Sequence, residues 1–211
     1  MAARKKFFSV DIPLTNSSFD VYANSINELE KKSIKLDLTR HLRGKSIEVI
    51  FKIKVENNKA TASPFKLTLL PFFIRRMLRK NISYVEDSLP VTCKDAELRI
   101  KPFLITRKKV SRKVRKALRN EMKIWIEDYC KSRPYKEIFA DIIGNRMQKP
   151  LSLKLKKIYP LALCEIRILK IEKLKEKENL KVTIEKITKE KAENKKIQNT
   201  KQDDAKNSGS N

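Results

Sequence analysis

The stretch SIEVIFKIKV, residues 46–55, decides the fold class of the first half of the chain. Within it Phe51 and Ile53 alternate with Lys52 and Lys54. This period of two is typical of a β-strand with one buried and one exposed face. The two asparagines that follow suit a tight turn, and KATASPFKL beyond them is again strand-like. The sequence therefore predicts a β-hairpin and, with it, a sheet.

Further strand-like segments surround this hairpin: FFSVDIP at 7–13, SIKLDL at 33–38, and VTCKDAELRIKPFLIT at 91–106, with a turn expected near residues 94–96. One short basic helix is expected to interrupt them at about 71–80, because Pro71 suits the first turn of a helix. The front of the chain, residues 1–106, is therefore predicted to be a β-rich lobe.

The segment RKKVSRKVRKALR, residues 107–119, has eight Lys or Arg and no acid. From its start to about residue 130 the spacing is helical, and at about 100° per residue one set of apolar side chains falls within roughly 140°. This predicted buried seam is Val110, Val114, Ala117, Leu118, Met122, Trp125 and Tyr129. Glu121 falls inside the seam and Ile126 outside it, which the sequence does not explain.

The other side of this helix is purely cationic. Like-charged pairs such as Lys108 and Arg112 stand four residues apart, and each destabilises a helix by about 0.2–0.5 kcal/mol. If Thr106 caps the helix, Arg107 to Lys109 occupy its first turn, where the helix dipole disfavours cations. A bound polyanion offsets both penalties, and exposure to water offsets neither. The abundance of Arg favours phosphates of nucleic acid over anionic lipid.

After this helix two short helices are expected, opened by Pro134 and Pro150. LALCEIRILKIEKL, residues 161–174, returns to alternation, with Ile166 and Ile168 on the same face. We predict a late strand that rejoins the front sheet. Residues 107–175 are thus expected to form a basic helical lobe plus this strand, packed on the first lobe.

Fifty Lys and Arg against twenty-five Asp and Glu give a net charge of +25, which indicates an anionic partner, with nucleic acid as the first candidate. The tail, residues 176–211, is rich in Lys, Glu and Asn and is expected to be largely disordered, although LKVTIEKI within it is compatible with an edge strand.

The three cysteines form no C-x-x-C pair, the start lacks the apolar core of a signal peptide, and no segment approaches the roughly 18 apolar residues of a membrane span. We expect a soluble cytoplasmic protein.

Residues that carry enzyme chemistry are scarce. One histidine, His41, and three isolated glycines provide neither a histidine-based catalytic pair nor a phosphate-binding glycine loop. Glu127 with Asp128, or Glu137 with Asp141, could hold a magnesium ion for nuclease chemistry, but they are more simply surface acids that balance nearby lysines. We therefore expect no enzyme activity, no metal, no cofactor and no small-molecule substrate.

The basic segments supply the candidate RNA contacts. Tyr159 joins them because it follows three lysines and could stack on an unpaired base. The candidate RNA-binding residues are Arg75, Arg76, Arg79, Lys80, Arg107, Lys108, Lys109, Arg112, Lys113, Arg115, Lys116, Arg119, Lys154, Lys156, Lys157 and Tyr159.

Several of these segments match a known pattern. They are KKVSRKVRKALRNEM, KIYPL at 157–161 followed by E-x-R-x-x-K at 165–170, KKFFSVDIP, FIRRMLRK and VTCKDAELRIKPFLIT. In this order they resemble the small-subunit ribosomal protein family of archaea and eukaryotes called eS1, or S3Ae, over about residues 4–175. Phe7 and Phe8 stand where the family has Trp and Tyr, so the chain looks like a divergent, archaeal-like member.

The resemblance implies a β-barrel-like front half with helices attached. It also implies docking on small-subunit rRNA near the platform, beside neighbouring platform proteins and the mRNA exit side. The sequence thus predicts an α+β protein that is a structural constituent of the small ribosomal subunit. Two alternatives stay open, an RNA-processing enzyme or metal-dependent nuclease subunit, and a DNA-compacting chromatin protein.

Overall fold

The structure, a computed structural model, describes residues 5–39, 42, 45–56 and 59–175. Up to Lys173 the chain forms one compact unit. The expected turn at the two asparagines after residue 56, His41 and the predicted disordered tail lie outside the described residues. The proposed division into a β-rich lobe, a helical lobe and a tail stays a prediction.

The hairpin predicted from the opening stretch is confirmed. β4 (Ile47–Glu56) pairs antiparallel with β5 (Lys59–Leu69) from end to end. Val49 and Phe51 are buried. Pro64, which has no N–H for the ladder, stands opposite Phe51 where the register shifts, so β5 accommodates it as part of a β-bulge.

Two other front strands are also where they were expected, β1 (Lys6–Ile12) and β3 (Ser33–Asp37). Between them lie β2 (Ser17–Ala23), which pairs antiparallel with β1, and a short 3-10 helix, η1 (Asn27–Leu29). Sequence reasoning missed β2, although the alternation in FDVYA was an available signal.

The second predicted hairpin joins β7 (Leu89–Thr92) to β8 (Ala96–Thr106), with its turn between them as expected. A short strand, β6 (Tyr84–Glu86), pairs further along β8. The predicted late strand is β9 (Leu161–Leu174), which pairs with β5 and lies next to β8. It does rejoin the front sheet.

The inward face of β9 does not follow a strict alternation. Cys164 and Ile166 are buried, and the next buried positions are Leu169 and Ile171. The alternation therefore changes phase after Ile166, and Ile168 is only half-buried, which differs from the predicted face.

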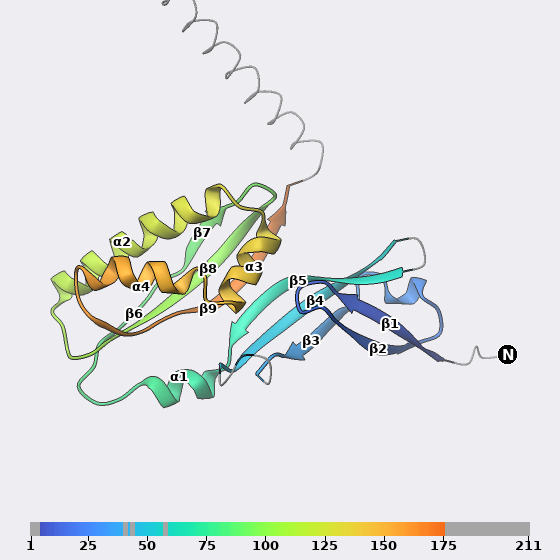
Figure 1. Cartoon of the computed structure of the whole chain (residues 1–211), viewed down its shortest axis with the longest axis horizontal. Coiled ribbons are helices and arrows are strands. Elements are labelled where there is room, and N and C mark those ends of the chain that lie inside the picture. The colour runs from blue at the N-terminus through green and yellow to red at the C-terminus, as the bar shows by residue number, and fades with distance from the viewer. Residues whose placement is uncertain (1–4, 40–41, 43–44, 57–58, 176–211) are drawn as a thin grey trace, which may run out of the picture. The chain divides into compact units, whose positions relative to one another are not determined.

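The described residues form one open nine-stranded sheet with the order β2-β1-β5-β9-β8-β6 along its main path (Figure 1). β3 and β4 extend it from the other edge of β5, and β1 runs parallel to β5. The expected antiparallel, barrel-like front half is therefore wrong. The reason is that one edge of β5 is shared: its first residues pair with β1 and its last with β9. This shared edge continues the sheet into the back half of the chain instead of closing it.

The described helices lie close to the predicted segments. α1 (Pro71–Met77) begins at its proline but ends earlier than expected. α2 (Arg112–Lys131), α3 (Tyr135–Ile143) and α4 (Gln148–Lys156) lie over the strands of the back half (Figure 1). No helix in the described ranges has the length and apolar character that crossing a membrane requires.

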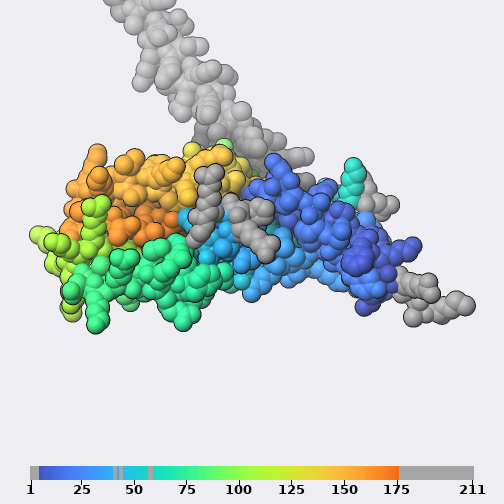
Figure 2. Space-filling model, turned by 60° about the horizontal axis from the view of Figure 1, so that its bottom comes forward, coloured from blue at the N-terminus to red at the C-terminus, as the bar shows by residue number. Residues whose placement is uncertain are grey.

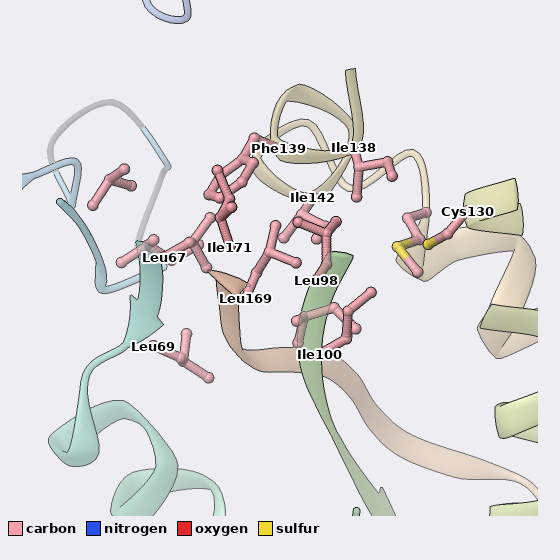
Figure 3. Close-up of a cluster of buried hydrophobic side chains, with 14 of the residues drawn as sticks. Leu67, Leu69, Leu98, Ile100, Cys130, Ile138, Phe139, Ile142, Leu169 and Ile171 are labelled. Atoms are coloured by element: carbon pink, nitrogen blue, oxygen red, sulfur yellow. The ribbon is translucent and has the colours of Figure 1, made fainter. Parts of the chain in front are cut away.

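The core beneath these helices is apolar (Figure 3). Leu98 from β8, Leu169 and Ile171 from β9, and Phe139 and Ile142 from α3 are all buried there. Fully burying one such side chain contributes roughly 1.5–3 kcal/mol, so this cluster holds α3 on the sheet.

The buried face of α2 is rotated from the predicted seam. Leu118 and Met122 are buried as expected, but Ile126 and Cys130 complete the row, and Ala117 is exposed. These four buried residues follow one another at steps of four, and this row packs against β6 and β7.

The rotation also explains the misplaced acid of the predicted seam. Glu121 faces α4, where its carboxylate lies 2.7 Å from the ammonium group of Lys154. It is therefore a partner for a neighbouring helix and not a residue of the core.

A buried polar cluster joins β9 to the front of the chain. The Nζ atom of Lys45 lies 2.6 Å from Oε2 of Glu165 and donates a hydrogen bond to Oδ1 of Asn145, with both side chains of the ion pair about one-tenth exposed. Gln148 donates to the same carboxylate oxygen at 3.4 Å and to the carbonyl of Ile142 at 2.8 Å. Burial raises the pKa of Glu165, while Lys45 acts in the opposite direction.

Candidate nucleic-acid interface

The basic helix begins later than the sequence suggested. Ser111 caps α2 by accepting a hydrogen bond from the N–H of Val114, at 3.5 Å. Thr106 is instead the buried last residue of β8, where its hydroxyl donates to the carbonyl of Ser83 at 2.9 Å and accepts from the N–H of Ser83 at 3.0 Å. The predicted cap at Thr106 is therefore wrong, because this residue belongs to β8.

The unfavourable interaction between cations and the helix dipole involves other residues than predicted, but it remains. Arg107 to Lys109 lie in the loop between β8 and α2 and not in a helical turn. Arg112 and Lys113 now occupy the first turn, which contains no acid. Positive side chains still stand at the positive end of the helix, where an anion is favoured.

Hydrogen bonds join three separate basic segments next to the end of β8. The N–H of Val110 donates to the hydroxyl of Ser83 at 3.2 Å, and the N–H of Arg107 donates to the carbonyl of Pro160 at 3.4 Å. The segments after α1, before α2 and after α4 therefore meet, and Figures 1 and 2 show them at the same end of the compact unit.

We call this surface the cationic end, and its members share exposure and positive charge. They are Arg79, Lys80, Arg107, Lys108, Lys109, Arg112, Lys113, Lys156 and Lys157. None of the nine takes part in an ion pair with a described acid, and the stretches that contain them, residues 78–83, 107–113 and 156–160, have no Asp or Glu. The surface is strongly positive and lacks an internal counter-charge.

Other predicted contacts on α2 and α4 are turned partly toward the protein. Arg119 lies 3.5 Å from a carboxylate oxygen of Asp87, and Lys154 has Glu121 as its partner. Arg115 is half-buried, with its Nε atom buried and without a hydrogen-bond partner in the described part of the chain. Lys116 is exposed. The rotation of α2 relative to the predicted seam turns Arg115 partly toward the protein, whereas Arg119 stays exposed as predicted.

The remaining candidates differ in their surroundings. Arg75 and Arg76 are exposed on α1, with the guanidinium carbon of Arg76 5.4 Å from the centre of the Phe73 ring. Tyr159 is half-buried and packs against the core, so only part of its ring is open for stacking. All sixteen residues stay predicted RNA contacts.

Three of the four acids considered for a magnesium site are engaged elsewhere, and the fourth, Asp128, is exposed. Asp141 is buried and accepts a hydrogen bond from the hydroxyl of Tyr129 at 2.9 Å, and burial together with this carboxylate raises the pKa of Tyr129 to about 12. Glu137 lies 3.5 Å from Arg133, and Glu127 lies 4.0 Å from Lys123. Across the described residues no three His, Cys, Asp or Glu side chains are grouped as metal ligands.

A test of the first turn of α2 is the variant Ser111→Asp. An Asp cap adds a negative charge beside Arg112 and Lys113, so we expect it to stabilise the free protein by about 0.5–1 kcal/mol and to weaken RNA binding. Urea unfolding and filter binding to structured RNA measure the two effects. Ser111→Asn is the control, because it caps without charge and should keep RNA affinity. Equal RNA affinity of the two variants would contradict a phosphate at this turn.

Comparison with known proteins identifies the family. The sequence model of the Ribosomal S3Ae family matches residues 3–176. The small ribosomal subunit protein eS1 of Nanoarchaeum equitans is 25% identical over 172 residues, covering 78% of this chain and 87% of that protein. Proteins of the same name from Halorubrum lacusprofundi and Picrophilus torridus are 28% and 29% identical over 138 and 133 residues, and each match covers 64% of the relative. The chain thus spans a little under two thirds of the length of these two relatives. Because the family model matches most of the chain, this protein belongs to the Ribosomal S3Ae family.

Proposed function

We propose that the protein is a non-enzymatic structural constituent of the small ribosomal subunit that binds rRNA through its cationic end. The observation that carries the proposal is the set of nine exposed cations, drawn from three segments, that have no described acid as a partner. An RNA backbone supplies closely spaced phosphates, and each neutralised phosphate releases condensed counterions. The name of the relatives agrees with this partner.

The same proposal gives the protein a cytoplasmic place in the subunit. We infer, from family membership, a position near the platform and the mRNA exit side, with platform proteins as neighbours and the mRNA close by. The cationic end would lie along rRNA, and the buried cores of sheet and helices would hold its three segments in a fixed relative position.

The experiment is co-sedimentation. Tagged protein expressed in its own cells should travel with small subunits through a sucrose gradient, and the bound fraction should fall as the salt concentration rises, because each phosphate contact adds to the salt dependence of binding. A protein found wholly in the ribosome-free fraction would overturn the proposal. The control for charge is a variant in which Lys131, Lys136 and Lys149, all outside the cationic end, are replaced by Gln.

A further inference from the structure

The β1–β2 hairpin carries a pair of exposed aromatic rings. Phe7 and Tyr22 stand directly opposite each other in the antiparallel register. The two residues are 72% and 56% exposed, and the ring centres are 5.0 Å apart with the planes tilted by 43°. The Nζ atom of Lys5 lies over the Tyr22 ring, 5.9 Å from its centre. The hairpin thus presents two rings and a cation to solvent.

The core of the protein does not need these rings. Along β1, Val10 and Ile12 point inward and are buried, whereas Phe7 is on the opposite face. The other positions that share the outer face of the hairpin are polar, namely Ser9, Asp11, Ser18 and Asp20. An exposed cross-strand aromatic pair contributes only about 0.2–1 kcal/mol to a sheet. The pair is therefore an isolated apolar platform on a polar face.

We propose that Phe7 and Tyr22 stack on unpaired bases of single-stranded RNA, with Lys5 at an adjoining phosphate. Aromatic rings on a sheet surface stack on bases of any identity because every base has a flat face, and a nearby cation attracts the backbone. Asp20 lies two residues from Tyr22 and repels phosphate, so we expect the RNA backbone to pass on the side of Lys5.

Two rings suit a nucleic acid better than a protein partner. A stable protein interface buries at least about 1,000 Å² in total, and polar residues surround this pair. Base stacking needs one ring for each base. The site is also separate from the cationic end, because β1 and β2 lie at the opposite end of the compact unit from β6 and the start of α2 (Figure 1). The proposal rests on RNA as the partner and adds a second contact that recognises unpaired bases.

The test compares two oligonucleotides bound by the full chain. One is a fluorescein-labelled oligoadenylate octamer, and the other is an abasic octamer with the same phosphates. We expect Phe7→Ala or Tyr22→Ala to lower affinity for the oligoadenylate about tenfold, equivalent to ~1.4 kcal/mol of stacking, and to leave abasic binding unchanged. Tyr22→Phe should bind like the wild type, because it keeps the ring. Phe7→Leu keeps apolar bulk without a flat face and should lose affinity like the Ala variant.

Two controls separate this site from the proposed rRNA surface. Phe72→Ala removes an aromatic ring that is 51% exposed on α1 and should change neither affinity. Arg112→Gln changes a residue of the cationic end and removes no stacking ring, so it should leave the preference for the oligoadenylate over the abasic octamer intact. The proposal is overturned if the wild type binds both octamers equally well, or if Phe7→Ala and Phe7→Leu leave the preference for bases intact. Neither outcome depends on ribosome association, which the sedimentation experiment tests separately.

Discussion

Replacing Lys109, Arg112 and Lys113 together by Gln is expected to weaken binding to structured small-subunit RNA by a factor on the order of 10²–10³ at ~0.1 M salt. Each side chain that neutralises a phosphate contributes about −0.9 to the slope of log affinity against log salt on a duplex-like backbone. Removing three contacts should therefore flatten the slope by about 2–3. Filter binding across a salt series measures both quantities. These residues are chosen because they are exposed at the start of α2 and have no described acid as a partner.

The matched control removes the same charge elsewhere. Lys131, Lys136 and Lys149 are exposed lysines outside the cationic end, at the end of α2 and in α3 and α4. Their replacement by Gln should change the slope by less than about 1, through net charge alone. Equal slopes for the two triple variants would show that binding follows total charge and not this surface.

The variant Lys45→Met is expected to destabilise the protein by about 3–5 kcal/mol at neutral pH, because it leaves the carboxylate of Glu165 buried without its cation. Burial already raises the pKa of Glu165 above its usual value, and losing Lys45 raises it further. A carboxyl with a raised folded-state pKa favours folding less as the pH rises above its unfolded-state pKa. The loss of stability in the variant should therefore be small in acid, where Glu165 is protonated in the folded and the unfolded state. It should grow as the pH rises through the folded-state pKa of Glu165. Urea unfolding at several pH values measures it.

Two further variants show whether the unpaired carboxylate is the cause. Combining Lys45→Met with Glu165→Leu removes both charges and should recover most of the lost stability. Lys35→Met breaks a 2.9 Å ion pair with Glu48 in which the lysine is 66% exposed, and should cost less than about 1 kcal/mol. A loss for Lys45→Met that does not vary with pH would assign the effect to packing.

Local structure was largely predictable, because it depends on neighbours in sequence. The period of two located β4, β8 and β9, and Pro71 marked the start of α1. The barrel was wrong because closure depends on which edges of a strand are free, and the sharing of one β5 edge by β1 and β9 leaves no trace in either strand's own pattern. The face of α2 was misjudged for a related reason. Ala117 suits a buried or an exposed position equally. Whether it or Ile126 is buried depends on how α2 packs on the strands beneath it.

The candidate site was predictable as a set of segments but not as a surface. Runs such as RKKVSRK announce positive charge, yet only the contacts of Ser83 and Pro160 show that three of them meet. The partners of Arg119 and Lys154 are Asp87 and Glu121, which lie on other elements. The polar cluster around Lys45 was missed because its members are scattered along the chain, and Glu165 inside an apolar strand was the one available signal.

The position of β9 between β5 and β8 has a consequence for how the protein is made. β1 to β5 are complete by residue 69 and β8 by residue 106, but the strand that joins them begins at Leu161. Because chains fold from the N-terminus as they emerge, a nascent chain carries two partial sheets whose facing edges lack a partner until α2, α3 and α4 have been synthesised. Unpaired edges recruit foreign strands. Translation that stalls before Leu161 should therefore yield aggregation-prone chains, and a chaperone or early contact with RNA would be most useful in that interval.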